Sequence, residues 1–392
     1  MTMKKIVALV FVSMLILGYQ TAPSAAFIPT KLLEIAARAL SFSFEDAITH
    51  EDMTRSAILD VAAEVLRDNP NPSDSQGSSQ RLSILSTDFD EEGLITAYYG
   101  YHDHTRIGAF EDAVKAIEEG NSNTDSGEEK KLAAAHFDSE EFESGQNRLI
   151  NLHHSIISLT MTGNVVKARE DTGRFLHALQ DFYSHSNWIE NGNRAPNPAL
   201  GQLNQRIDNV ASPTQQTCVD CVKKGWIFKY YECNDNIVQS LKTQGILTSG
   251  YFEGLTDDAG REIPKPYGKC SHGGVGDSTH DTFARGGINK DGPYYRTSPH
   301  HYLYDEAVAV AQQATIDMLR DIRREVNNDQ LFGVYLGVFL SQAAMEGMAM
   351  RINHDGVNPP MRSQAKQSPT EILLLQYAKQ IYGKQKNNFL SL

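Results

Sequence analysis

The sequence predicts a mainly α-helical protein with one long irregular, cysteine-containing insertion. Three observations carry this prediction. Apolar residues recur at helical spacing through most of the first half and again over residues 307–322. Between residues 191 and 299, Gly, Pro and short strand-like runs replace that pattern. All 4 cysteines of the chain fall inside this insertion.

Residues 1–26 have the features of a secretory signal peptide. Lys4 and Lys5 form a charged start, residues 6–17 an apolar run, and residues 24–26 a small-residue cleavage site. A membrane anchor is the alternative, but the apolar run is too short to span a bilayer. We therefore expect a secreted, extracellular protein that begins at Phe27 and has no transmembrane segment.

The rest of the chain divides into a helical domain, 27–340, which contains the insertion, and a C-terminal helix and tail, 341–392. The formal net charge is −13, and loss of the signal lysines makes it more negative. An acidic protein is a poor partner for polyanionic nucleic acid. We do not expect nucleic acid as a partner.

A helix is predicted to begin at Thr49, because Thr49 to Asp52 resembles a capping box. His50 then lies in the first turn, where the positive end of the helix dipole keeps its ring neutral. A neutral ring can bind a metal, but an exposed first-turn residue fits the pattern equally well.

The stretch His177–Trp188 (HALQDFYSHSNW) lies late in another predicted helix and is the main candidate site. His177, Asp181 and His185 are spaced i, i+4, i+8, so they line one face. His177 and Asp181 suit one zinc ion. His185 lies about 12 Å along the axis from His177, so it needs a second ion, with Asp181 as bridge. A polar stripe on a solvated face is the alternative.

Other segments offer similar donors. The acidic loop expected at 120–129 contains Asp125, and a His-Phe pair follows it at His136. Further on, residues 298–301 (SPHH) predict a helix start with Ser as cap and Pro at the first position. His301 and Asp305 form another i, i+4 pair there, which could hold a metal jointly with His185.

The cysteines predict two disulfides, because an exported chain meets an oxidising environment. They are Cys218, Cys221, Cys233 and Cys270. Four cysteines allow three pairings, and the sequence does not choose among them. Structural zinc on the C-x-x-C pair is the alternative.

The strings FLHALQDFYSHSNW and SPHH resemble the signature of the Het-C family and of the N-terminal region of von Willebrand factor A domain-containing protein 7. Those regions resemble in turn the all-helical, zinc-dependent phospholipases C and single-strand nucleases. The resemblance spans approximately residues 27–340 and implies a multi-helix bundle of that type.

By this resemblance, up to three zinc ions are bound. The first would be held by Phe27 (amine and carbonyl), His50 and Asp181; the second by Asp125, His136, His177 and Asp181; the third by His185, His301 and Asp305.

The implied activity is that of a phosphodiester hydrolase of phospholipase C type, with His177 and Asp181 as the catalytic pair. Zinc lowers the pKa of bound water to about 7 and clamps phosphoryl oxygens. The acidic charge favours a phospholipid headgroup as substrate over nucleic acid. The alternative is a non-catalytic extracellular protein that keeps the fold for interaction.

Overall fold

The computed structural model describes residues 27, 28, 30, 31, 33–35, 38, 46–85, 89–225, 230–274, 276–341 and 345. The chain separates into two units, Met1–Leu340 and Ser341–Leu392, and nearly all described residues belong to the first. The predicted signal peptide, 1–26, and most of the predicted C-terminal helix and tail, 341–392, lie outside the described residues.

The first unit is mainly helical, so the predicted fold class is confirmed. Its α-helices are α3 (His50–Asp68), α4 (Ser75–Ile84), α5 (Glu91–Tyr99), α6 (His104–Ser126), α7 (Ala133–His136), α8 (Phe142–Met161), α9 (Val165–His185), α10 (Gln239–Gln244), α11 (Tyr304–Val326) and α12 (Asp329–Leu336). Short 3-10 turns are η1 (Glu128–Lys131), η2 (Ser278–Asp281) and η3 (His301–Leu303). One antiparallel pair of strands, β1 (Val222–Lys224) and β2 (Tyr230–Glu232), places Lys223 opposite Tyr231.

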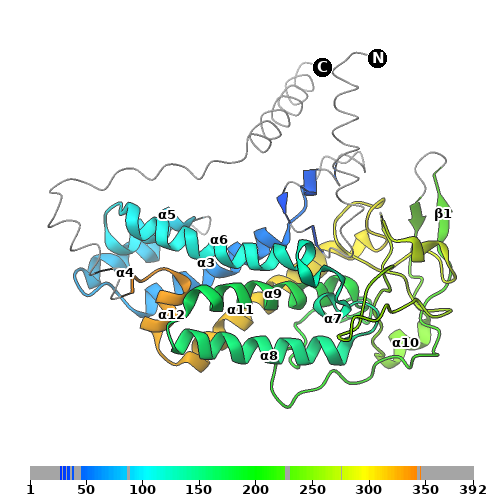
Figure 1. Ribbon diagram of the computed structural model, residues 1–392. Coiled ribbons are helices and arrows are strands. Elements are labelled where there is room, and N and C mark those ends of the chain that lie inside the picture. Colours follow the sequence, from blue (N-terminus) through cyan, green and yellow to red (C-terminus); the bar gives the residue numbers. More distant parts are fainter. Residues whose placement is uncertain are drawn as a thin grey trace, which may run out of the picture. The chain divides into compact units, whose positions relative to one another are not determined.

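Helix α9 is the centre of the bundle. It packs against α6, α8, α11 and α3, and these long helices run side by side in Figure 1. Every residue from Phe175 to His185 is buried. The alternative that His177, Asp181 and His185 form a polar stripe on a solvated face is therefore wrong.

Two local predictions about the start of α3 are confirmed. Thr49 caps α3, with its hydroxyl accepting from the Asp52 amide at 3.1 Å and the Asp52 carboxylate accepting from the Thr49 amide at 2.9 Å. His50 follows in the first turn and is fully buried, so the exposed alternative is wrong. Gly163, at φ 78°, turns the chain from α8 into α9, so these two helices form a helical hairpin.

The prediction of an acidic loop at 120–129 is wrong, because α6 continues to Ser126. Gly120 does not end the helix; it lets α6 approach α9 closely. A Cβ at Gly120 would lie 2.7 Å from the Glu170 carbonyl oxygen, nearer than side-chain atoms pack. Asp125 therefore lies in the last turn of a helix, and the helix sets the direction of its side chain.

The insertion gathers at the end of the bundle where α7 and α10 lie (Figure 1). The 3-10 turn η2, the strands β1 and β2 and the short helix α10 are the regular elements among its described residues, so the irregular character of 191–299 is confirmed. Its cysteines form the disulfides Cys218–Cys270 and Cys221–Cys233, and none is free.

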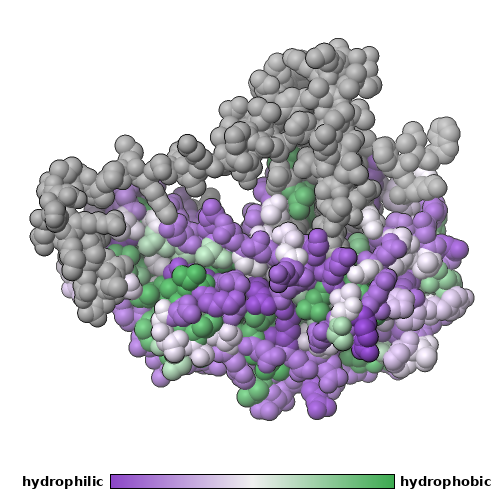
Figure 2. All heavy atoms as spheres, viewed as in Figure 1, coloured by the Kyte–Doolittle hydropathy of each residue, from purple (hydrophilic) through white to green (hydrophobic). Residues whose placement is uncertain are grey.

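Hydrophilic side chains dominate the described part of the surface shown in Figure 2, with hydrophobic ones scattered among them. Among the described residues, no helix combines the length and apolar character that crossing a membrane requires.

Candidate metal centre

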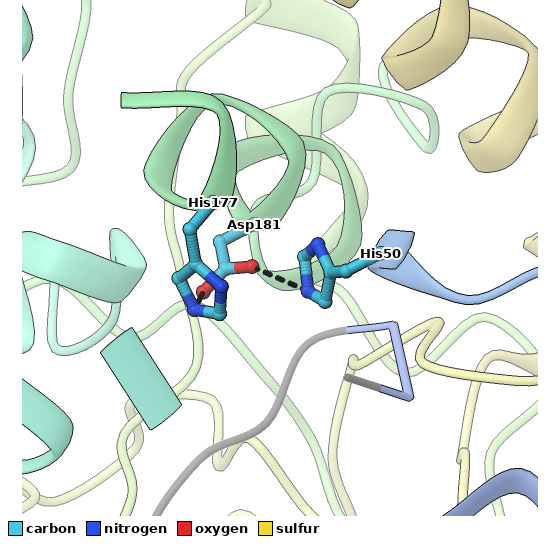
Figure 3. Close-up of side chains that lie close together, drawn as sticks. All are labelled: His50, His177 and Asp181. Carbon is cyan, nitrogen blue, oxygen red and sulfur yellow. Dashed lines mark ion pairs between the residues drawn. The ribbon is translucent and has the colours of Figure 1, made fainter. Parts of the chain in front are cut away.

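Helix α9 directs His177 and Asp181 inward, where His50 of α3 meets them (Figure 3). The two Asp181 oxygens face different nitrogens. Oδ1 lies 3.1 Å from His50 Nε2, while Oδ2 lies 3.1 Å from His177 Nε2 and 2.9 Å from His136 Nδ1. All four side chains are completely buried. Asp181 therefore has the position of a carboxylate that bridges two sites.

Asp125 completes the group on the α6 side. Its Oδ1 lies 3.4 Å from His177 Nε2 and 3.7 Å from His136 Nδ1, and those two nitrogens are 3.2 Å apart. Ligands bound at about 2.0–2.1 Å to one tetrahedral zinc lie about 3.3 Å from one another. Asp125, His136 and His177 are thus spaced as ligands of one ion.

Amide side chains fix the protonation of the rings. His177 Nδ1 lies 2.9 Å from Asn121 Oδ1, and the Asn121 amide nitrogen donates to Thr54 and Gln180. His50 Nδ1 lies 2.5 Å from Gln180 Oε1. Because amide oxygens only accept, each Nδ1 carries the proton and each Nε2 presents a lone pair. Metal-binding histidines are oriented by such partners.

Several atoms that face this interior space have no hydrogen bond. They are both oxygens of Asp125, Oδ1 of Asp181 and Nε2 of His50. Burying such groups without partners costs several kcal/mol. Cations held between them would satisfy all four atoms, so the residues fit a metal.

Without a metal, protons have to balance the carboxylates. Burial lowers the pKa of His177, but Asp125 and Asp181 more than offset this and raise it to about 10. Burial also raises the pKa of Asp181, yet His177, His136 and His50 hold it well below its usual range. A metal entering this site must therefore displace a proton from His177.

A second cluster lies at the last residue of α9. His185 Nε2 is 2.9 Å from Nε2 of His272, a residue of the insertion. Asp138 lies at the other nitrogen of the His185 ring, with its Oδ1 3.2 Å from His185 Nδ1. Asp291 lies 3.5 Å from His185 Nε2 and 3.6 Å from His272 Nε2. Burial lowers the pKa of both rings to about 4 and raises that of Asp291 to about 6.

The structure does not bring His301 and Asp305 to His185, so the predicted third ligand set is corrected. Neither residue joins the metal-ligand groups found among the described residues. His301 lies in η3 with its ring edge toward Tyr295, 6.3 Å between centroids, and Asp305 is exposed. The physical reason is that α11 begins only at Tyr304, so the pair does not share a helical face.

Sequence reasoning missed Asp138 and Asp291, and it left His272 out of the ligand set because a turn residue was the favoured interpretation. Asp138 stands two residues after His136, which was the available signal. His272 and Asp291 lie in the irregular insertion, where no periodicity predicts a direction.

Phe27 lies beside the centre. Its ring meets that of His50 edge-on, 5.7 Å between centroids. The adjoining backbone is fixed on both sides: the His50 amide donates to the Ile28 carbonyl at 3.2 Å, and the Ile28 amide donates to the Asp291 carbonyl at 3.3 Å. Phe27 and His50, expected to share an ion, are neighbours.

Comparisons with known proteins show which family this chain resembles. Residues 89–332, which include all the candidate ligands except His50 and Phe27, match the model of the VWA7 N-terminal domain. Von Willebrand factor A domain-containing protein 7 of mouse is 32% identical over 329 residues, 83% of this chain and 33% of the relative. The human protein is 32% identical over 320 residues, 81% of this chain and 32% of the relative. The chain thus spans about a third of the length of these relatives, and no solved structure matches it. The chain belongs to the VWA7 N-terminal domain family.

Proposed function

We propose that this protein is a secreted, zinc-dependent phosphodiester hydrolase of phospholipase C type, related to the Het-C proteins. One observation carries the proposal. The two oxygens of Asp181 face nitrogens of His50 on one side and of His136 and His177 on the other, at 2.9–3.1 Å. A carboxylate that bridges two ions needs this arrangement.

The donor set favours zinc, because imidazole nitrogen and carboxylate oxygen are its usual ligands beside thiolate. When bound, zinc ions would activate a water molecule near neutral pH and stabilise phosphoryl oxygens. His50, His136 and His177 supply neutral nitrogens, and the charges of Asp125 and Asp181 offset those of the ions. His177 and Asp181 lie one turn apart on the buried helix α9, which fixes the position of each side chain relative to the other. A phospholipid headgroup is the proposed substrate class.

The first ion would also use the amine of Phe27 once residues 1–26 are removed. The contact between Phe27 and His50 supports this assignment, and two disulfides suit an exported protein. Mass spectrometry of the secreted chain tests it: we expect an N-terminus at Phe27. A mature chain starting upstream of Phe27 would remove the amine from the site.

The second candidate is a non-catalytic extracellular protein in which the metals are structural. The completely buried side chains of His50, His136, His177 and Asp181 favour it, because structural zinc sites are closed whereas catalytic sites keep an open position.

The test uses purified mature protein and two substrates, p-nitrophenylphosphorylcholine and bis(p-nitrophenyl) phosphate. We expect hydrolysis that a chelator abolishes and zinc restores, and that is lost in Asp125→Asn. Glu143→Gln, an exposed carboxylate on α8, is the matched control. Bound zinc without hydrolysis of either substrate would favour the non-catalytic candidate, and absence of bound zinc would exclude both.

A further inference from the structure

We propose a further metal site, formed by His185, His272 and Asp291, which holds a zinc ion that joins the insertion to the helical bundle. It extends the proposed metal-dependent function but draws on different residues from the Asp181 centre. One of its ligands, His185, comes from α9. The other two, His272 and Asp291, come from the insertion.

The strongest evidence is the pair of facing imidazole nitrogens. His272 Nδ1 lies 2.8 Å from the Gly273 carbonyl oxygen, and His185 Nδ1 lies 2.8 Å from the His136 carbonyl oxygen. Carbonyl oxygens only accept, so both rings carry their proton at Nδ1. Both Nε2 atoms then present lone pairs to each other at 2.9 Å. Two lone pairs at this distance repel unless a cation lies between them.

Two carboxylates supply the charge that such a cation needs. Asp291 Oδ1 lies 3.5 Å from His185 Nε2, and its Oδ2 lies 3.6 Å from His272 Nε2. Asp138, fully buried, lies at the other nitrogen of the His185 ring, with its Oδ1 3.2 Å from His185 Nδ1, and adds negative charge beside the site. Ligands of one tetrahedral zinc lie about 3.3 Å apart, close to the spacing of Asp291 and the two rings. Two carboxylates neutralise one divalent ion.

The disulfide Cys218–Cys270 fixes the segment that carries His272. Cys270 precedes His272 by two residues, and both of its bonded sulfurs are fully buried. The Tyr251 amide donates to the Cys270 carbonyl at 2.9 Å, and the His272 amide donates to the Tyr251 carbonyl at 2.8 Å. The backbone of His272 is therefore held on one side by the disulfide at Cys270 and by its hydrogen bond to Tyr251.

The disulfide Cys221–Cys233 supports the same residue from the other side, through two glycines. A Cβ at Gly286 would lie 2.3 Å from the sulfur of Cys221, and one at Gly287 would lie 2.3 Å from the His272 carbonyl oxygen. Only a chain without side chains fits between the disulfide and His272. The next residues hydrogen-bond to the His272 carbonyl and lead directly to Asp291.

The site is buried, and its three protein donors come from segments that are distant in the sequence. An ion bound there would hold the insertion to the helical bundle. We infer that the two disulfides position His272 and Asp291 before the ion binds, and that the ion then fastens the insertion to α9.

The test counts zinc per chain in the complete mature protein by mass spectrometry and follows cobalt spectra. We expect His272→Ala to lose one ion while the ions of the Asp181 centre remain, and Asp305→Asn to lose none. An unchanged count in His272→Ala, or loss of the ion in Asp305→Asn, would overturn the site. If His272→Ala does not fold, His272→Asn gives the same readout with a smaller change of volume.

Asp181→Asn separates this inference from the proposed function. Loss of zinc in His272→Ala but not in Asp181→Asn would leave this site standing and sink the Asp181 centre. Loss of zinc in Asp181→Asn but not in His272→Ala would leave the Asp181 centre standing and overturn this site.

The positioning role of the disulfides is tested with two double variants, Cys218→Ser with Cys270→Ser, and Cys221→Ser with Cys233→Ser. We expect each to weaken zinc binding at His272 by tenfold or more in chelator competition, with the affinity of the Asp181 centre unchanged. Equal weakening at both centres would indicate a general loss of stability and overturn the positioning role.

Discussion

Gly120 of α6 and Gly173 of α9 are in contact where the two helices cross. A Cβ at Gly173 would lie 2.3 Å from the Ile117 carbonyl oxygen and 2.5 Å from the carbonyl carbon of Gly120. The helix backbones therefore approach more closely than any side chain allows. This approach places Asp125, in the last turn of α6, beside His177, one turn beyond Gly173.

Gly173→Ala should destabilise the protein by about 1–3 kcal/mol, the usual cost of overpacking a core. Because the added methyl meets backbone, the helices have to separate and Asp125 has to withdraw from His177. Zinc affinity should fall with stability, measured by urea unfolding and chelator competition. Val166→Ala, at a 72% exposed position of the same helix, should change neither. Normal zinc binding in Gly173→Ala would show that the crossing does not set the site.

The sequence was sufficient to predict the bundle around α9. Helical periodicity predicted α3, α8 and α9, and the capping box at Thr49 predicted the start of α3. The i, i+4 spacing then placed His177 and Asp181 on one face. This succeeded because α9 is regular through both residues, so spacing in sequence translates directly into direction in space.

The rest depended on interactions between distant residues. Glycine is typical of turns, but Gly120 serves as a close contact between two helices. Only the position of Gly173 on the facing helix reveals this role. His272 is directed by hydrogen bonds and disulfides that join segments far apart in the chain. His301 and Asp305 had helical spacing, but the chain there is a 3-10 turn before α11, so the spacing misdirected the assignment.

Asp181→Asn should remove at least one zinc ion and lower the melting temperature more than His185→Ala does. The change keeps the shape of the side chain but removes the charge that faces both His50 and His177. Metal binding is linked to folding, so a chelator should lower the wild-type melting temperature similarly. Zinc per chain and thermal unfolding are the measurements.

The matched control for this variant is Glu170→Gln, an exposed carboxylate on the same helix. It should retain all zinc and shift stability by less than about 0.5 kcal/mol. Unchanged zinc in Asp181→Asn would end the bridging assignment.

Acid should lower the stability of the folded protein because it protonates the Glu129 carboxylate. Burial would raise the pKa of this carboxyl, but hydrogen bonds and charges from Arg174 and Arg148 lower it to about 2 from 4.5. A folded-state pKa below the unfolded value stabilises the protein above pH 4.5, and this contribution is lost as the pH falls toward 2. The loss should be on the order of 2 kcal/mol, since the side chain is partly exposed.

The check is to compare wild type with Glu129→Gln by urea unfolding at pH 7 and pH 3, in metal-free protein. The variant should be less stable than wild type at pH 7, and the difference should shrink by about half at pH 3. A constant difference between the two pH values would contradict the assignment.

Lys290→Met should cost about 3–5 kcal/mol, the penalty for breaking a buried ion pair from one side. The completely buried Lys290 ammonium lies 2.9 Å from Glu190 and donates to the carbonyls of Ser186 and Ile288 at 3.0 and 2.9 Å. Without it, the buried Glu190 carboxylate keeps its contact with the His300 ring, but burial lowers the pKa of that ring, so the ring does not replace the lost positive charge. The control Lys223→Met breaks an ion pair with Asp281 whose side chains are 43% and 57% exposed, and should cost much less stability, because solvent screens exposed ion pairs. Urea unfolding of both variants gives the comparison, and similar costs would show that the buried pair contributes no more than a surface one.

Because Asp291 follows Lys290 directly, Lys290→Met should also reduce zinc affinity at His272, whereas Lys223→Met should leave it unchanged.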